Sequence, residues 1–254
     1  MQDRFKKLIA NEFSNCVRNT INRMSINEPT YRPFHTALLS EDVIYWSRFE
    51  RSFSTSFGQR VIEEIAKIVA LSNGASEVQR QKTTIVNIDE AYDEAITSHI
   101  KELRQNIETR RDWNTSLNRI QKTPIVGSNR EIRIISDLWW KKDNTENFIS
   151  LKTVKPNIDQ TAVAKEDCLR LKIAFPQCNV YFGLPYNPYG NEKNSYYHSP
   201  PMRIFDFHRD PVVLIGKELW DTIGGRGCYE ELLDIARQVG QETREQITLL
   251  RNNQ

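Results

Sequence analysis

The stretch Arg130–Trp140 reads REIRIISDLWW, and the stretch Phe148–Val154 reads FISLKTV. Both are rich in β-branched and aromatic residues, and the first partly alternates apolar with polar positions, which is typical of β-strands. The polar segment KKDNTEN lies between them and has the composition of a turn. The two stretches are therefore predicted to pair as a β-hairpin.

Outward from this hairpin, the apolar residues recur mainly with helical spacing. Upstream, three helices are expected, over 1–23, from Ser40 to about Leu71, and over 88–115. Ser72-Asn73-Gly74 is expected to end the second of them. Downstream, we expect a helix over Asp159–Phe175, strands over Asn179–Leu184 and Val212–Ile215, and helices near Lys217–Ile223 and Tyr229–Gly240. This order predicts an α/β fold with a mixed central sheet flanked by helices.

No clear linker divides the chain, so a single domain over residues 1–254 is expected. Residues 1–115 are expected to be mainly helical. Residues 116–254 are expected to hold the sheet and the C-terminal helices.

The composition is that of a folded water-soluble protein, with 39% apolar and 27% charged residues. Its net charge of only +2 does not by itself indicate a nucleic-acid binder, although positive charge can gather locally around a cleft. The four cysteines are far apart and form no metal-binding motif, which favours reduced thiols in a cytoplasmic protein. Neither a signal peptide nor an apolar run of about 20 residues is present, so no membrane association is expected.

Asp137 lies within the first strand of the predicted hairpin, and Lys152 lies near the end of the second. The pairing would bring their side chains to one point of the sheet. A carboxylate there can bind Mg²⁺, which prefers oxygen ligands and can activate a water for attack on a phosphate. A lysine can position that water or stabilise negative charge on the phosphate. This is the arrangement of the PD-(D/E)XK nucleases.

The chain departs from that pattern, because Ser150 stands where a second acid is expected and Ser136 replaces the usual proline before Asp137. A serine cannot replace the missing carboxylate. Glu166 can, because it is spaced with Ala162, Leu169 and Ile173 along one helical stripe predicted to face the sheet. An acid on an apolar stripe needs a partner, and a metal would provide one. The alternative for Glu166 alone is an exposed helix glutamate.

A further metal ligand is expected from the long early helix, at Glu63 or Glu64. Gly58 followed by Ile62-Glu63 favours the first, whereas helical projection places Glu64 nearer the apolar face. Both remain open, and so does the alternative that both are solvated.

Two resemblances follow from these residues. Ser-x-Lys followed by thirteen residues and Glu resembles the relocated-glutamate nucleases related to NgoMIV and EcoRII. The ordered phrases PFH to LL (33–39), FERSFST (49–55), LKTVKPN (151–157), YFGL with YNPYG (181–190) and VLIGKE with WD (213–221) resemble the TdeIII family of type II restriction endonucleases. The resemblance covers roughly residues 30–240.

The TdeIII resemblance implies a restriction-endonuclease-like core that makes Mg²⁺-dependent double-strand cuts in palindromic DNA, with GGNCC the expected target. It also implies a homodimer, because a two-fold pair suits a palindrome, and a cognate DNA methyltransferase in the same restriction-modification system. Members of the family tend to carry a glutamate two residues before the lysine, so Ser150 departs from them.

In the relocated-glutamate relatives, base-reading residues precede the glutamate, which here points to Lys155, Asn157, Asp159 and Gln160. Such side chains can pair with base edges in the major groove. Alternatively, Asp159 caps the helix and Asn157 ends a strand.

Three other functions compete with the restriction endonuclease. One is a catalytically inactive DNA-binding relative, suggested by Ser150. Another is a structure-specific DNA repair nuclease on the same fold. The last is an interaction protein in which Asp137, Lys152 and Glu166 form a buried ion-pair network.

Overall fold

The computed structural model describes residues 1–25 and 31–252. These residues form two compact units, one comprising residues 69–229 and the other comprising residues 1–68 with 230–254. We call the first the sheet unit and the second the helical unit, and we describe each by itself.

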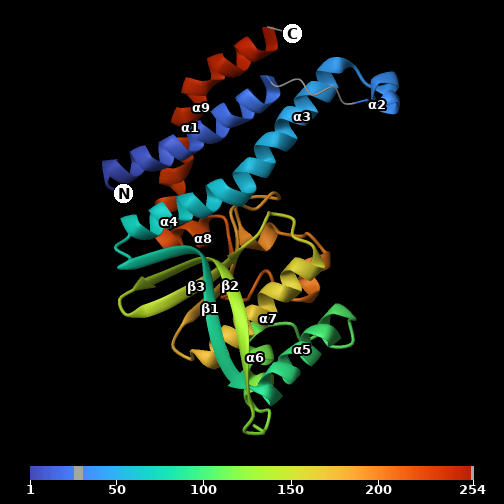
Figure 1. Cartoon of the computed structure of the whole chain (residues 1–254), viewed down its shortest axis with the longest axis vertical. Coiled ribbons are helices and arrows are strands. Elements are labelled where there is room, and N and C mark those ends of the chain that lie inside the picture. The colour runs from blue at the N-terminus through green and yellow to red at the C-terminus, as the bar shows by residue number, and fades with distance from the viewer. Residues whose placement is uncertain (26–30, 253–254) are drawn as a thin grey trace. The chain divides into compact units, whose positions relative to one another are not determined.

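The sheet unit contains one mixed sheet of five strands, which lie in space in the order of the sequence (Figure 1). The strands are β1 (Glu77–Asp89), β2 (Asn129–Lys142), β3 (Thr145–Leu151), β4 (Asn179–Leu184) and β5 (Val213–Ile215). The β1–β2 and β2–β3 pairs are antiparallel, whereas β3–β4 and β4–β5 are parallel. The predicted α/β class with a mixed, helix-flanked sheet is confirmed.

The predicted hairpin is β2 and β3, which are joined by the two residues Asp143 and Asn144. Both have positive φ, 49° and 61°, a conformation that Asp and Asn tolerate and that two-residue hairpin turns require. The second strand ends earlier than predicted, at Leu151. Lys152 therefore follows the strand directly, and its backbone N–H donates to the carbonyl of Gly183 in β4, at 3.0 Å.

Strand β1 was not predicted, and it lies in the region of the chain expected to be mainly helical. Its sequence, EVQRQKTTIVNID, is polar over its first eight residues except for Val78, and only its last residues are buried. The mixture of charged and β-branched residues hides the two-residue alternation that would have identified it.

Four helices accompany the sheet: α5 (Glu90–Arg104), α6 (Trp113–Gln121), α7 (Ile158–Ala174) and α8 (Lys217–Gly224). The single helix predicted over 88–115 is wrong, because Asp89 caps α5 by accepting from the N–H of Ala91 and α5 ends at Arg104. The predictions for α7, β4, β5 and α8 agree with the structure to within two residues. The core beneath the sheet is mainly apolar, with Val86, Ile96, Phe148, Leu169 and Phe182 at most 2% exposed, and it also encloses the polar side chains of His99 and Lys165.

The helical unit contains α1 (Asp3–Ser25), α2 (Pro33–Leu38), α3 (Glu41–Ser56) and α9 (Cys228–Asn252). The long helix expected from residue 40 to 71 is present, but a π-helical segment, η1 (Phe57–Val61), separates α3 from α4 (Ile62–Ser72). α1 buries Ile9, Cys16, Thr20 and Met24, whereas Leu8 is 50% exposed.

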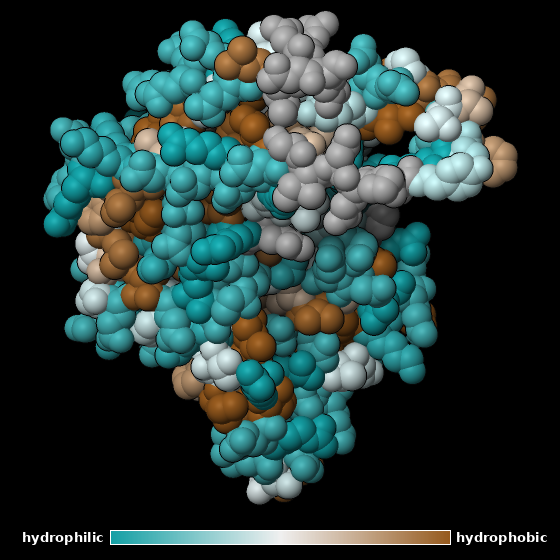
Figure 2. Space-filling model, turned by 45° about the horizontal axis from the view of Figure 1, so that its top comes forward, coloured by the Kyte–Doolittle hydropathy of each residue, from teal (hydrophilic) through white to brown (hydrophobic). Residues whose placement is uncertain are grey.

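Hydrophobic side chains are dispersed among hydrophilic ones over the molecular face in Figure 2. Within the described ranges, no helix has the length and apolar character needed to cross a bilayer. All four cysteines are buried, and none forms a disulfide.

Candidate active site

The structure brings Asp137 and Lys152 together, as the hairpin pattern predicted. Oδ2 of Asp137 accepts from Nζ of Lys152 at 2.9 Å and from the backbone N–H of Leu151 at 2.8 Å. The Ser150 hydroxyl donates to the same oxygen at 3.3 Å. The Asp137 and Lys152 side chains are 18% and 24% exposed. They are therefore accessible from solvent and do not form a sealed ion-pair network.

Hairpin register explains this convergence. Leu138 pairs with Ile149, so continuing the ladder by one residue places Asp137 opposite Ser150, beside the end of β3. Because the backbone of Lys152 is held by β4, its long side chain starts from a fixed point next to the carboxylate.

Gln81 is a site residue that sequence reasoning missed. It lies on β1 opposite Asp137, where the β1–β2 ladder is interrupted between the pairs Arg80–Leu138 and Lys82–Ser136. Its φ is +49°, which is uncommon for glutamine, and its Nε2 donates to Oδ1 of Asp137 at 3.2 Å. Unusual backbone conformations of this kind gather at functional sites. No sequence signal pointed to it, because β1 itself was not recognised.

Glu166 is directed elsewhere. Its Oε1 accepts from the Thr97 hydroxyl on α5, at 3.0 Å, and from Arg170 one turn further along α7, at 2.8 Å. Arg170 also pairs with the buried Asp93 of α5, at 2.7 Å. The prediction that this carboxylate faces the sheet is wrong, because it lies at the edge of the buried stripe where α7 meets α5. Its role in catalysis stays a prediction.

Asp167, the next residue along, is the acid of α7 that lies within electrostatic range of the hairpin site. The pKa of Asp167 is raised to about 6, mainly by burial, with Arg170 opposing the shift and Glu166 adding to it. Lys152 lowers this pKa and Asp137 raises it. Its neighbour Cys168 is buried and directs its thiol to the carbonyl of Tyr181 in β4, at 3.8 Å. Sequence reasoning did not single out Asp167, which directly follows Glu166 on α7.

The carboxylates of Asp137 and Asp167 are of the chemical type that a hard divalent cation binds, because Mg²⁺ binds proteins through one or two carboxylates while keeping several waters. Across the described residues, no group of three or more His, Cys, Asp and Glu side chains is arranged to hold a metal. The two carboxylates therefore suit a partly hydrated ion rather than one enclosed by protein ligands.

Glu63 and Glu64 both lie in the first turn of α4 and are partly buried. Glu64 pairs with Lys67 at 3.1 Å. Their participation in a metal site stays a prediction.

The predicted DNA-reading residues all lie at the start of α7 and are exposed. Asn157 caps the helix and forms a capping box with Gln160, with bonds of 2.8 and 3.2 Å. The alternative that Asp159 is the cap is therefore wrong, and Asp159 instead pairs with Arg104. Lys155 lies over the ring of Tyr189, at 5.3 Å. Their contact with bases stays a prediction.

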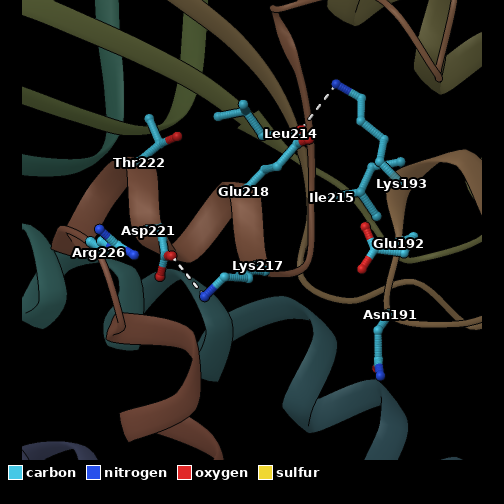
Figure 3. A pocket seen from close by; sticks show the side chains of 10 residues that line it. All are labelled: Asn191, Glu192, Lys193, Leu214, Ile215, Lys217, Glu218, Asp221, Thr222 and Arg226. Carbon is cyan, nitrogen blue, oxygen red and sulfur yellow. Dashed lines mark ion pairs between the residues drawn. The ribbon is translucent and has the colours of Figure 1, made fainter.

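A pocket of about 510 Å³ lies elsewhere in the sheet unit, beside β5 and α8 (Figure 3). Its lysines are paired with acids of its own wall, Lys193 with Glu218 and Lys217 with Asp221, both at 3.0 Å. A glycine-rich turn at residues 224–227 ends α8 next to it, with Gly225 at φ +84°. It has the character of a structural cavity.

Comparison with known proteins agrees with the geometry. The model of the HinfI type II restriction endonuclease family matches residues 1–240. The type II restriction enzyme HgiCII of Herpetosiphon aurantiacus is 29% identical over 228 residues, which cover 85% of this chain and 80% of the relative. HgiEI and HgiBI, from the same organism, are each 30% identical over 223 residues with the same coverage. With its hairpin carboxylate and lysine and a family match over almost its whole length, the chain belongs to the HinfI family of type II restriction endonucleases.

Proposed function

We propose that this chain makes Mg²⁺-dependent double-strand cuts in DNA at a short palindromic site. The observation that carries the proposal is the 2.9 Å contact between Lys152 Nζ and Asp137 Oδ2 at the solvent-accessible end of β3. A carboxylate and an ammonium held together on a hairpin are suited to phosphodiester hydrolysis, and the curated relatives are named type II restriction enzymes.

Asp137 and Asp167 would hold the metal, with Glu63 or Glu64 assisting. A bound Mg²⁺ would polarise the scissile phosphate and lower the pKa of a bound water. Lys152 orients the attacking water and stabilises the negative charge that develops on the phosphate. Gln81 keeps the Asp137 carboxylate in place from the β1 side. The contacts of Glu166 with Thr97 and Arg170 favour a structural role over the metal-binding role predicted from its spacing.

The target GGNCC and the TdeIII relationship rest on the sequence resemblance, as do the homodimer and the cognate methyltransferase. A two-fold dimer would present two equivalent sites to the two strands of a palindrome. In this proposal both units act as a single nuclease domain, in the cytoplasm, where the methylated host DNA lies. Lys155, Asn157, Asp159 and Gln160 would contact the bases.

The test is digestion of phage DNA of known sequence by the purified protein, with fragment ends mapped in Mg²⁺ and in EDTA. We expect discrete ends at GGNCC in Mg²⁺ and intact DNA in EDTA. Discrete ends at another sequence would reject GGNCC alone. A smear would favour the structure-specific nuclease, and intact DNA in Mg²⁺ would favour the inactive relative.

A further inference from the structure

The outer face of α1 in the helical unit is composed of amides and arginines. Asn15, Arg18, Asn19, Asn22 and Arg23 are spaced at i, i+3, i+4, i+7 and i+8, so they share one side of the helix. All five are exposed. The asparagine side-chain amides form no hydrogen bond within the described chain. Free amides in a row along one helix face are available to an external partner.

This face borders a groove of about 600 Å³ that α1 shares with the end of α3 and with η1. Arg23 spans the groove, donating to the Ser56 hydroxyl and to the backbone carbonyl of Asn19, the latter at 3.1 Å. On the opposite wall lies Arg60, which is exposed. The acid that lines the groove is Glu12, so its side chains carry a net positive charge.

Arg60 belongs to the π-helical segment η1, which interrupts an otherwise continuous helix from Glu41 to Ser72. Single π-helical turns are rare and are frequently found at functional sites, because they widen a helix locally and rotate its side chains. The π-helical interruption therefore lies at the groove. It is a second indication of a functional surface, and it does not depend on the charges of the groove.

We propose that the groove between α1 and η1 is a contact surface for duplex DNA, with Arg18, Arg60 and the asparagines of α1 as its contacting residues. This rests on the proposed function. Arginine and asparagine bind phosphate oxygens, and both read base edges in the major groove, which admits an α-helix. Because the whole chain carries a charge of only +2, attraction to a polyanion requires local concentration of positive charge, and this groove provides one.

A second copy of the chain is the competing occupant. Exposed asparagines and arginines would then have to be desolvated against protein, and each polar group left unpaired would oppose association. Phosphates and water satisfy such groups directly, as is usual in protein–DNA interfaces. The chemistry of the face therefore favours DNA.

The experiment measures the Kd of a fluorescent duplex that carries the mapped cleavage site, in EDTA and over a range of salt concentrations. Arg18 and Arg60 form no ion pair among the described residues, so their replacement should leave the fold intact. For Arg18→Ala with Arg60→Ala we expect binding weakened about 10-fold or more and a salt slope reduced by about 1 for each phosphate that is no longer bound. Arg209→Ala, at an exposed arginine of the sheet unit, is the matched control and should bind as the wild type does.

Asn19→Ala distinguishes the kinds of contact. A loss of roughly 5- to 150-fold confined to the cognate duplex indicates base reading, and an equal loss on a scrambled duplex indicates a phosphate contact. Wild-type Kd values and salt slopes in both groove variants would overturn the inference. So would a double variant that changes oligomeric state on gel filtration with unchanged DNA affinity, because the face would then join two copies. A wild-type protein that binds no DNA would instead reject the proposed function itself.

Discussion

The β2–β3 hairpin and helix α7 carry the candidate catalytic residues in contrasting ways. In the hairpin, the side chains of Ser150 and Lys152 both donate to one carboxylate oxygen, Oδ2 of Asp137. On α7, the adjacent acids Glu166 and Asp167 lie at opposite edges of the buried face, one toward α5 and one within range of the hairpin. A strand pair thus fixes its site by register, whereas on a helix a shift of one residue turns a side chain by about 100° and changes its partners.

The largest expected effect is in the hairpin. Lys152→Ala should reduce the rate of plasmid cleavage in Mg²⁺ by about 1,000-fold, or about 4 kcal/mol, because the ammonium beside the reacting phosphate is removed. Lys142→Ala, which removes a lysine at the far end of the same hairpin, should cleave at the wild-type rate. A Lys152→Ala enzyme within a few-fold of wild type would remove this lysine from the site.

The next comparison separates the two acids of α7. Asp167→Asn should slow cleavage by about 100-fold or more, because a metal-binding carboxylate becomes neutral while the shape is kept. Glu166→Gln should retain most of the activity and lower the free energy of unfolding by about 1 kcal/mol, through its weakened bond to Arg170. Cleavage rates and urea unfolding of both variants give the measurement. The reverse outcome would restore Glu166 as the catalytic acid.

The same contrast explains what the sequence could predict. Asp137 and Lys152 could be found because a hairpin with a two-residue turn leaves little freedom in register. The partners of Glu166 on α7 could not be found, because Thr97 and Arg170 are brought to its carboxylate by helical and tertiary packing. Gln81 could not be found, because its strand is polar and its backbone conformation is imposed by the sheet.

A pH effect should come from the packing of α5 against α6. His99 is fully buried on α5, with Nε2 at 2.9 Å from the Ser116 hydroxyl. Burial, together with the nearby charges of Lys165 and Arg119, lowers the pKa of His99 to about 4. In the unfolded chain this pKa is about 6.5, so between pH 6.5 and 4 the unfolded state binds more protons.

Stability should therefore fall as the pH falls through that window, by at most about 3 kcal/mol from this residue. His99→Gln should flatten the dependence when urea unfolding is measured at several pH values. At pH 7 the same variant should cleave DNA at close to the wild-type rate, because His99 hydrogen-bonds Ser116 and Arg119 of α6 and not the hairpin site. An unchanged pH dependence in the variant would assign the effect to other groups.

The smallest effect is expected at Ser150, where the PD-(D/E)XK pattern has an acid. Its hydroxyl donates to Asp137 Oδ2 at 3.3 Å, longer than the bonds from Leu151 and Lys152 to the same oxygen. Ser150→Ala should therefore slow cleavage only a few-fold, equivalent to about 1 kcal/mol or less. If Ser150→Ala were as damaging as Lys152→Ala while Asp167→Asn remained active, the hairpin alone would supply the chemistry. Both acids of α7, Glu166 and Asp167, would then have structural roles only.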